Sequence, residues 1–535
     1  MEQPRSELDA SLAPHPWFRA VAVDYDGTLT DNEMPSAVVL RALHDARRAG
    51  FRLILVTGRI LTELRAVFPG VDQWFDAIVA ENGAVLVQRG TERPLARPVD
   101  PRLLSVLLGW GAEARQGQVI VATRATHGPR LTDLIHTLGL DYQLLYNRGE
   151  LMVLPSSVSK GAGLLEALGN LGLSAHECIG IGDAENDHTL LETCEVGVAV
   201  GNAVPALKHR ADVVLDQSAG EGVVAFLDKL RCPEGWELLP LRRSLYLGTA
   251  DDGAPVQIPA THVNVLIRGP SGSGKSYLAG LLAERVLRLD YSLCLIDPEG
   301  DHAHLGKQPR VLHVGEGSSL VPVAMVRELL AKRLSSVVVD LCQVPYEARM
   351  PYVQELLSEL FELRRRTGLP HWLIVDEAHL PFSEGDRPYE LEQDRTAALC
   401  VVTYRPEWMR AGVMADIDFV IDTLREGRSR IRRGHAPPIE FRPAMRELPH
   451  QRHLGKYLHG TCPRALGFWF RTREGNTGAL ARNLRDFGVE VGRAPDASLR
   501  HHLARGDFSR WVRDVFRDAD LADAIASIER VNATP

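Results

Sequence analysis

Short apolar runs alternate with helical patterns along most of the chain, and each run has the length of a buried strand. They lie at 21–23, 53–56, 77–80 and 179–181 in the first half, and at 263–267, 337–339, 372–375 and 398–402 in the second. Strands that alternate with helices are typical of parallel α/β sheets. The pattern therefore predicts two successive α/β units with mainly parallel sheets.

Two carboxylates end the first apolar run. Asp24 and Asp26 follow Val21–Val23, and a Gly27-Thr28 turn comes directly after them. Side chains at i and i+2 of a strand point the same way, and open α/β sheets bind ligands at the carboxyl ends of their strands. A carboxylate pair there can attack phosphorus and transfer protons, although an Asp-Gly turn after a strand is also common.

Further polar motifs follow in the same half of the chain. They are Val-Thr-Gly-Arg at 56–59, Glu-Asn-Gly-Ala at 81–84, Ser-Lys-Gly at 159–161 and Gly-Asp-Ala-Glu-Asn-Asp at 182–187. Thr57 offers a hydroxyl and Lys160 an ammonium to a phosphate, while Asp183 and Asp187 add two acids. Carboxylates that converge at strand ends repel one another unless a hard cation with oxygen ligands, most simply Mg²⁺, lies between them.

These motifs, in this order, resemble the haloacid dehalogenase superfamily of phosphatases, and specifically its Cof-like branch. The resemblance implies that Asp24 is the nucleophile and Asp26 the acid/base, and that Thr57 and Lys160 grip the phosphate. It implies that Mg²⁺ is held or supported by Asp24, Asp26, Asp183 and Asp187. It also implies a Rossmann-like core at 17–83 and 156–230.

An insert of about 70 residues, the size of a small domain, separates the two parts of this core. The resemblance implies an α/β cap (type IIB) at 84–155, similar to those of archaeal phosphoglycolate phosphatases and sucrose-phosphate phosphatases. Such a cap predicts a small phosphorylated metabolite as substrate, for example a sugar phosphate or a phosphoglycolate-like ester. Candidate substrate contacts, which could equally be solvated surface residues, are Arg124, Arg130, Asn147 and Arg148.

A second phosphate-binding motif lies beyond a change of composition near 232–235. Gly269-Pro-Ser-Gly-Ser-Gly-Lys-Ser276 follows an apolar strand and precedes an amphipathic helix at 277–288. In such a loop the glycines let backbone N–H groups face phosphate oxygens, the lysine reaches the terminal phosphates, and the helix N-terminus attracts the anion. The residues predicted to bind the nucleotide here are Gly269, Gly272, Gly274, Lys275 and Ser276, with Ser276 on Mg²⁺.

An acidic pair follows a later strand, at Asp376-Glu377. Asp376 would orient Mg²⁺ and Glu377 would position water for ATP hydrolysis. The succession of strands at 337–340, 371–375 and 398–403 resembles P-loop ATPases with an added strand between the two nucleotide motifs. In that resemblance Thr403 senses the terminal phosphate, and the ATPase domain covers 240–435.

Two segments narrow this resemblance to HerA- and FtsK-type ATPases. They are Leu-Ile-Asp-Pro-Glu-Gly-Asp-His at 295–302 and Val-Thr-Tyr-Arg-Pro at 402–406, where Tyr404 stands in place of the usual Gln. That difference puts the sensing role and fast hydrolysis in question. Asp-Glu-Ala-His at 376–379 also resembles a helicase motif. A helicase, however, needs a second motor domain with its own motifs, and no such motifs appear after residue 435.

Arginines gather near the end of this domain, at 425, 428, 430, 432 and 433. One of them could complete the site of a neighbouring subunit in a homo-oligomer, or they could form a solvated hairpin. Residues 448–535 are predicted to form a small, mainly helical accessory module without assigned chemistry. His501, His502 and Asp507 suggest a metal site, but adjacent residues of a helix point in different directions, which favours helix packing.

Composition sets the remaining limits. The chain has 535 residues with 61 basic and 69 acidic side chains, and the net charge of −8 does not indicate nucleic-acid binding. Its seven cysteines form no CxxC pair, so neither a disulfide framework nor a zinc site is predicted. The polar N-terminus and the lack of a membrane-spanning stretch lead us to expect a cytoplasmic protein without membrane contact.

The sequence thus predicts a Mg²⁺-dependent phosphomonoesterase fused to an ATP-hydrolysing P-loop domain. An alternative is an ATP-driven nucleic-acid translocase or nucleotide-dependent switch with a regulatory or degenerate phosphatase domain. A third reading, a nucleotide-gated scaffold, is less attractive because the catalytic carboxylates are present.

Overall fold

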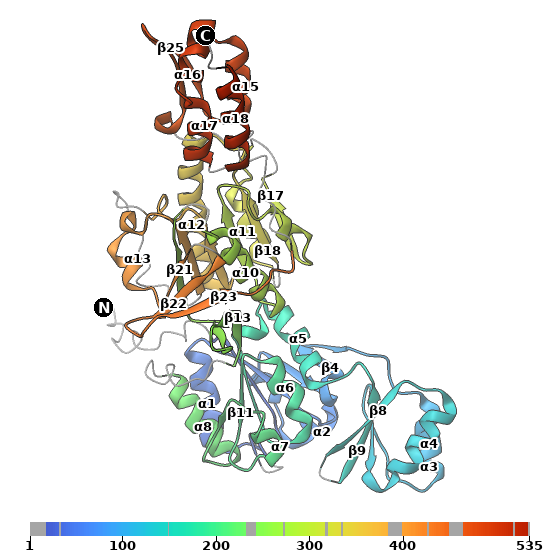
Figure 1. Cartoon of the computed structure of the whole chain (residues 1–535). Coiled ribbons are helices and arrows are strands. Elements are labelled where there is room, and N and C mark those ends of the chain that lie inside the picture. The colour runs from blue at the N-terminus through green and yellow to red at the C-terminus, as the bar shows by residue number, and fades with distance from the viewer. Residues whose placement is uncertain are drawn as a thin grey trace, which may run out of the picture. The chain divides into compact units, whose positions relative to one another are not determined.

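The computed structural model describes two compact units, one ending at Arg243 and one starting at Ser244 (Figure 1). The described residues are 18–30, 34–147, 149–231, 242–270, 273–315, 319–332, 335–382, 398–424, 427–448, 464–516 and 519–532. In this part of the chain no helix combines the length and the apolar character needed to cross a membrane.

The first unit is built on an eight-stranded sheet with the order β12-β11-β10-β1-β2-β3-β4-β5. Its parallel strands are β1 (Ala20–Val23), β2 (Arg52–Val56), β3 (Ala77–Ala80), β10 (Cys178–Gly182), β11 (Val196–Ala199) and β12 (Val213–Val214). The antiparallel strands β4 (Val85–Gln88) and β5 (Thr91–Pro94) extend one edge. Every residue of β1, β3, β10 and β11 is buried, which explains why these strands are continuous apolar runs.

Helices connect these strands, and polar residues fix where the helices begin. They are α1 (Ala37–Arg48), α2 (Leu61–Val67), α5 (Lys160–Leu171), α6 (His188–Thr193), α7 (Pro205–Lys208) and α8 (Ala219–Leu230), with short 3₁₀ turns η1 (Val71–Gln73), η2 (Glu81–Gly83), η4 (Ala175–Glu177) and η5 (Glu185–Asp187). The Ser159 hydroxyl accepts the N–H of Ala162 at the start of α5, and Gly172 ends that helix with a φ of 72°. This cap makes Lys160 the first residue of α5, which determines where its side chain starts.

A separate four-stranded sheet, with the order β6-β7-β9-β8, lies between β5 and α5 in the chain. Its strands are β6 (Arg115–Gln116), β7 (Val121–Arg124), β8 (Tyr142–Asn147) and β9 (Glu150–Pro155), with helices α3 (Pro101–Gly109) and α4 (Gly128–Leu138) and the turn η3 (Ala125–His127). Leu103 and Leu107 of α3, and Leu131 of α4, pack with Val121 and Leu151 of the sheet. Residues 99–155 therefore form a small α/β cap with its own core.

The second unit has an eleven-stranded sheet with the order β14-β13-β23-β22-β21-β15-β20-β19-β16-β18-β17. The parallel part consists of β15 (Asn264–Arg268), β16 (Leu293–Asp297), β17 (Val311–Val314), β18 (Ser336–Asp340), β19 (Trp372–Val375), β20 (Ala398–Thr403) and β21 (Phe419–Thr423). The antiparallel part consists of β13 (Ser244–Ala250), β14 (Pro255–Pro259), β22 (Ser429–Arg433) and β23 (Ile439–Pro443). Strand β20 lies between β15 and β19, which agrees with the resemblance to P-loop ATPases that have an added strand between the two nucleotide motifs.

The helices of this unit are α10 (Lys275–Arg288), α11 (Val323–Leu330), α12 (Tyr346–Thr367) and α13 (Ala411–Ala415), with the turns η6 (Ala303–Lys307) and η8 (Pro406–Trp408). Arg364 of α12 is fully buried, and its guanidinium donates to the carbonyl oxygens of His371 (3.3 Å) and Ala398 (2.7 Å). These bonds tie the helix to the starts of β19 and β20, the strands that carry Asp376 and Thr403 at their other ends.

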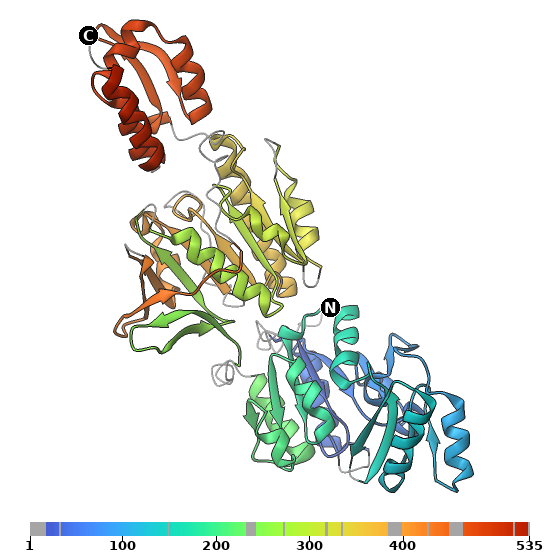
Figure 2. The ribbon, with the colours of Figure 1, turned by 45° about the vertical axis from the view of Figure 1, so that its right-hand side comes forward.

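The C-terminal segment is a hairpin packed with helices, shown in orange and red in Figure 2. It contains the turn η10 (Arg464–Leu466), β24 (Phe468–Thr472), β25 (Gly475–Ala481), α15 (Leu484–Arg493), α16 (Asp496–Leu503), α17 (Asp507–Trp511), the π-helical turn η11 (Val512–Phe516) and α18 (Ala519–Asn532). Phe468, Phe470, Phe508 and Trp511 form its aromatic core. The predicted mainly helical module is therefore confirmed.

Candidate active sites

Three buried carboxylates meet at the carboxyl edge of the first sheet. Asp24 follows β1, and Asp183 follows β10, which pairs with β1 in parallel register. Asp187 ends the turn η5, and one oxygen from each of the three carboxylates lies within 4.8 Å of the others. The structure thus brings together the predicted nucleophile, Asp24, and two of the predicted metal-binding residues, Asp183 and Asp187.

Lys160 places an ammonium group within this cluster. Its Nζ lies 2.6 Å from Oδ1 of Asp24 and 2.6 Å from Oδ1 of Asp187, and all three side chains are buried. Burial opposes the charge of Lys160, but Asp187 and Asp24 outweigh it and raise its pKa. Lys160 is therefore a permanent cation between two of the acids.

One ammonium does not balance three carboxylates. Burial, followed by the charge of Asp187, raises the pKa of Asp24 well above its ordinary value. A buried group of oxygen ligands with excess negative charge is the donor set that hard divalent cations bind. The residues present therefore fit Mg²⁺.

The loop from β10 to η5 is held by its own carboxylates. Oδ2 of Asp187 accepts the backbone N–H groups of Asp183 and Ala184, each at 3.0 Å. The hydroxyl of Thr28, from the turn after Asp26, donates to Oδ1 of Asp183 at 3.1 Å. These bonds fix the acids of one loop against the loop that carries the predicted nucleophile.

Asp26 forms an ion pair with Arg59. Nε and Nη2 of Arg59 donate to its two carboxylate oxygens at 2.8 and 2.6 Å, and both side chains are partly exposed. Asp26 is not among the three clustered carboxylates, so its role as acid/base and as metal ligand stays a prediction. The sequence predicts no role for Arg59, although Arg59 lies two residues after Thr57 in the Val-Thr-Gly-Arg motif.

Thr57 is fully buried, and its hydroxyl accepts the N–H of Arg59 at 3.1 Å. Beside it, the side chain of Asn82 accepts from Asn186 (3.1 Å) and donates to the sulfur of Met152 in the cap (2.6 Å). The cap thus touches the core next to the residues predicted to hold phosphate.

Two of the predicted cap contacts have partners inside the cap. Arg124 donates to Glu113, and the guanidinium of Arg130 lies 4.1 Å from the ring centre of Trp110. The side chain of Asn147 and all of Arg148 lie outside the described residues.

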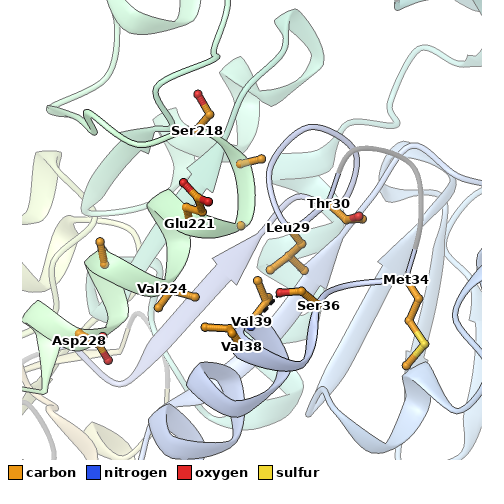
Figure 3. Close-up of a pocket in the computed structure, with 13 residues that line it drawn as sticks. Leu29, Thr30, Met34, Ser36, Val38, Val39, Ser218, Glu221, Val224 and Asp228 are labelled. Carbon is orange, nitrogen blue, oxygen red and sulfur yellow. Dashed lines mark hydrogen bonds between the residues drawn. The ribbon is translucent and has the colours of Figure 1, made fainter.

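A pocket of about 810 Å³ lies between the start of α1, α8 and the segment Leu29–Thr30 (Figure 3). Leu29, Val39 and Val224 give it apolar walls, and Glu221 contributes a carboxylate. It includes none of the three clustered acids, so we assign it no part in the chemistry.

The phosphate loop of the second unit joins β15 to α10. Gly269 has a φ of 155°, and a Cβ there would lie 2.1 Å from the hydroxyl of Thr423, so the position requires glycine. Gly274 caps α10 with a φ of 99°, and Lys275 donates from Nζ to the carbonyl oxygen of Pro270 at 3.0 Å. Ser276 is half-buried in the first turn of α10, whereas Gly272 lies outside the described residues.

The predicted magnesium-orienting acid lies beside a buried histidine. Oδ1 of Asp376 accepts the N–H of Glu377 at 2.8 Å, and its Oδ2 lies 3.5 Å from Nε2 of His302. Asp297, at the end of the neighbouring strand β16, accepts four backbone N–H groups from residues 299–302. Burial is the main cause that raises the pKa of Asp297 to about 7.

Although burial opposes its charge, the carboxylates of Asp297 and Asp376 raise the pKa of His302. The sequence predicts no role for His302. Its only signal there was its place in the segment 295–302 that resembles HerA- and FtsK-type ATPases.

Thr403 and Glu377 are joined by His379. Nδ1 of His379 lies 3.1 Å from the Thr403 hydroxyl and 3.3 Å from Oε2 of Glu377. Burial, followed by the charge of Arg405, lowers the pKa of His379 to about 4, so the ring is neutral near pH 7. Tyr404 stacks edge-on against His379, with ring centres 4.7 Å apart.

Three of the arginines near the end of this domain, at 430, 432 and 433, lie on β22, which pairs with β21 and β23. Arg428 and Arg430 both donate to the carboxylate of Glu440 on β23, and Arg428 also pairs with Asp251. This agrees with the hairpin interpretation, while Arg425 lies outside the described residues and a role across a subunit interface stays a prediction.

In the C-terminal module both ring nitrogens of His502 serve the fold. Nδ1 lies 2.9 Å from the carboxylate of Asp507, and Nε2 accepts the backbone N–H of Arg471 at 2.9 Å. One ligand atom from each of His501, His502 and Asp507 lies within 4.8 Å of the others, so the residues are close enough for the suggested metal site. Both ring nitrogens of His502 already have partners within the module, which favours the packing interpretation.

Comparison with known proteins divides the chain in the same way. A family model described as haloacid dehalogenase-like hydrolase matches residues 21–126 and 144–227, and one described as Helicase HerA, central domain, matches residues 246–425. Phosphoglycolate phosphatase of Methanothermobacter thermautotrophicus is 32% identical over 230 residues, which are 41% of this chain and 100% of the relative. Phosphoglycolate phosphatase 2 of Saccharolobus solfataricus is 28% identical over 218 residues, 39% of this chain and 91% of the relative. A solved haloacid dehalogenase-like hydrolase from Bacteroides thetaiotaomicron is 19% identical with a TM-score of 0.35, covering 40% of this chain and 99% of its own.

Proposed function

Because the chain belongs to the haloacid dehalogenase-like hydrolases through its N-terminal unit, we propose that this unit hydrolyses a small phosphomonoester through Asp24. The observation that carries the proposal is the buried contact of Lys160 with both Asp24 and Asp187. An ammonium at this position holds Oδ1 of the nucleophile and adds positive charge where a phosphate would bind.

The reaction then has two displacements. A carboxylate oxygen of Asp24 attacks phosphorus while the bond from phosphorus to the ester oxygen breaks, and Asp26 gives that oxygen a proton. Asp26 next takes a proton from the water that attacks the aspartyl-phosphate, which releases phosphate and restores Asp24. Thr57 holds a phosphate oxygen through its buried hydroxyl, and Arg59 orients Asp26.

Asp24, Asp183 and Asp187 are the residues that would hold Mg²⁺ in this unit. The bound ion would offset the charge of the carboxylates and polarise the phosphate toward attack.

The substrate we propose is a sugar phosphate or a phosphoglycolate-like ester. Support comes from the phosphoglycolate phosphatases that align with this unit over most of their length, and from the small cap that touches the core beside Thr57 and Asn82.

For the second unit we propose binding and hydrolysis of ATP with Mg²⁺. Lys275 and Ser276 lie at the N-terminus of α10, where helix and loop attract phosphate, and Asp376 and Glu377 follow β19. Thr403 lies on β20, between the strands that carry these two motifs, and would contact the terminal phosphate.

The match to the HerA central domain favours a second candidate for this unit, an ATP-driven translocase or switch that acts on nucleic acid. In that role the unit would work as a homo-oligomer. The net charge of −8 counts against nucleic acid as the partner. Addition of DNA to the ATPase assay separates the candidates, because a translocase hydrolyses ATP faster when it is bound to nucleic acid.

The deciding experiment is a phosphate-release screen over small esters with the full chain, Mg²⁺ present or chelated, and ATP or DNA present or absent. We expect Mg²⁺-dependent release that is lost in Asp24→Asn and kept in Lys275→Ala. Release that survives in Asp24→Asn would contradict the assignment of the nucleophile.

A further inference from the structure

The side chain of Glu81 joins the core of the first unit to its cap. Glu81 follows β3 and is fully buried. Its carboxylate accepts the backbone N–H groups of Gln118 (2.8 Å), Val119 (2.9 Å) and Ile120 (3.2 Å). These residues form the loop between β6 and β7, so one core carboxylate receives three donors from the cap. Hydrogen bonds to an ionised acceptor are stronger than those between neutral groups.

The loop approaches Glu81 so closely that position 117 has room only for glycine. A Cβ on Gly117 would lie 2.4–2.5 Å from the three atoms of the Glu81 carboxyl group. Gly117 is not among the glycines with positive φ, so space and not backbone conformation requires this residue.

The turn that carries Glu81 has an unusual backbone. Glu81, Asn82 and Gly83 have φ values of 54°, 56° and 104°, a region that residues with side chains rarely adopt. Such a conformation persists only where the surroundings enforce it, and it is often found at functional sites.

The same turn contacts the predicted phosphate site. The N–H of Asn82 donates to the carbonyl of Thr57, and the N–H of Glu81 donates to the carbonyl of Arg59, each at 3.0 Å. The amide of Asn82 meets Met152 in β9 of the cap. The turn thus links the strand end that carries Thr57 and Arg59 to two separate places in the cap.

We propose that Glu81 is a positioning residue that anchors the β6–β7 loop and so places the cap, with Met152, beside the phosphate site. It does not touch the reacting atoms. The effect on turnover rests on the proposed phosphatase function, whereas the anchoring itself does not. The expected result of losing the anchor is weaker binding of esters whose leaving group the cap contacts.

Hydrogen exchange in the full chain tests the anchoring directly. In Glu81→Gln the side chain keeps one acceptor oxygen, but its NH₂ group can only donate and would face the backbone N–H groups of the loop. Exchange at the amides of residues 118–120 should therefore accelerate about tenfold or more. Glu63→Gln is the matched control, since it removes a partly exposed carboxylate that also contacts the cap, through Arg115. Unchanged protection of residues 118–120 in Glu81→Gln would overturn the proposal.

Steady-state kinetics of a variant at Gly117, on the cap side of the contact, test the predicted effect on ester binding. Gly117→Ala pushes the loop away from Glu81, so KM for an ester found in the screen should rise about tenfold while kcat changes much less. Partial unfolding would instead lower kcat at constant KM. In Glu81→Ala the space is vacated, so adding Gly117→Ala should cost less than it does alone. Additive effects in the double variant would contradict the contact. If the wild-type chain hydrolyses no ester, the proposed function fails and the exchange result still decides the anchoring.

Discussion

The two phosphate-binding regions of this chain place carboxylates at strand ends in the same way, but balance their charge differently. In the first unit Lys160 donates directly to Asp24 and Asp187 inside a buried cluster. In the second unit the buried acids Asp297 and Asp376 face the imidazole of His302, while Lys275 donates to a carbonyl of its own loop.

The difference concerns when each site acquires its geometry. A buried ammonium between two carboxylates is fixed by folding, because separating the charges would leave them unpaired away from water. A lysine on a carbonyl of its own loop can exchange that neutral acceptor for a phosphate when nucleotide binds. The first site is thus organised before its ligand arrives, and the second is organised further by its ligand.

The largest effect should come from the predicted nucleophile. Asp24→Asn replaces a carboxylate by an amide that cannot attack phosphorus, and kcat for phosphate release should fall by about a thousandfold or more. ATP affinity, measured with a fluorescent ATP analogue, should be unchanged. A residual rate within about tenfold of wild type would show that Asp24 does not react.

Removal of the buried ammonium should be costly for the fold. Lys160→Met leaves Asp24 and Asp187 without their cation, and the free energy of unfolding of the first unit should fall by about 3–5 kcal/mol in urea titrations without metal. Lys208→Met is the matched control, because Lys208 donates to the neutral carbonyl of Gly201 and the loss of that bond should cost about 1 kcal/mol. Equal losses in the two variants would remove the contrast between the two regions.

Substitutions in the phosphate loop of the second unit should weaken the binding of ATP. Lys275→Ala removes the cation predicted to reach the terminal phosphates, so ATP affinity should fall by about tenfold to a hundredfold. Glu377→Gln should keep that affinity and slow hydrolysis, because the amide cannot position water as the carboxylate does. Undiminished ATP binding by Lys275→Ala would place the nucleotide elsewhere.

The smallest effect concerns pH and His379. Its pKa in the folded protein is about 4 against an ordinary value of 6.5, because burial and Arg405 disfavour the charged ring. The folded state therefore resists protonation, so the stability is complete above pH 6.5 and is lost as the pH falls toward 4. Between pH 7 and pH 5 wild type should lose about 1 kcal/mol more than His379→Gln, measured by urea unfolding. A pH dependence of His379→Gln identical to that of wild type would contradict the assignment.

Much of both sites could be predicted because parallel strands end at one edge. Asp24 and Asp183 each follow an apolar strand, and parallel pairing of β1 with β10 brings them together. The position of β20 between β15 and β19 followed from the succession of strands and from resemblance.

Contacts between distant segments could not be predicted in the same way. Arg59 reaches Asp26 across 33 residues, and Glu81 reaches Val119 across 38. His302 meets Asp376 only because β16 and β19 are neighbours. Side-chain direction and loop path decide these contacts, and neither leaves a periodic signal in the sequence.

The most direct test of the account is to trap the phosphoryl group on the enzyme. The full chain is mixed with Mg²⁺ and a phosphate-labelled ester identified in the screen, quenched in acid, digested and analysed by mass spectrometry. We predict one phosphorylated peptide that contains Asp24, present in wild type and in Lys275→Ala and absent in Asp24→Asn. Turnover of the ester without any label on that peptide, or with the label on another residue, would contradict the central claim.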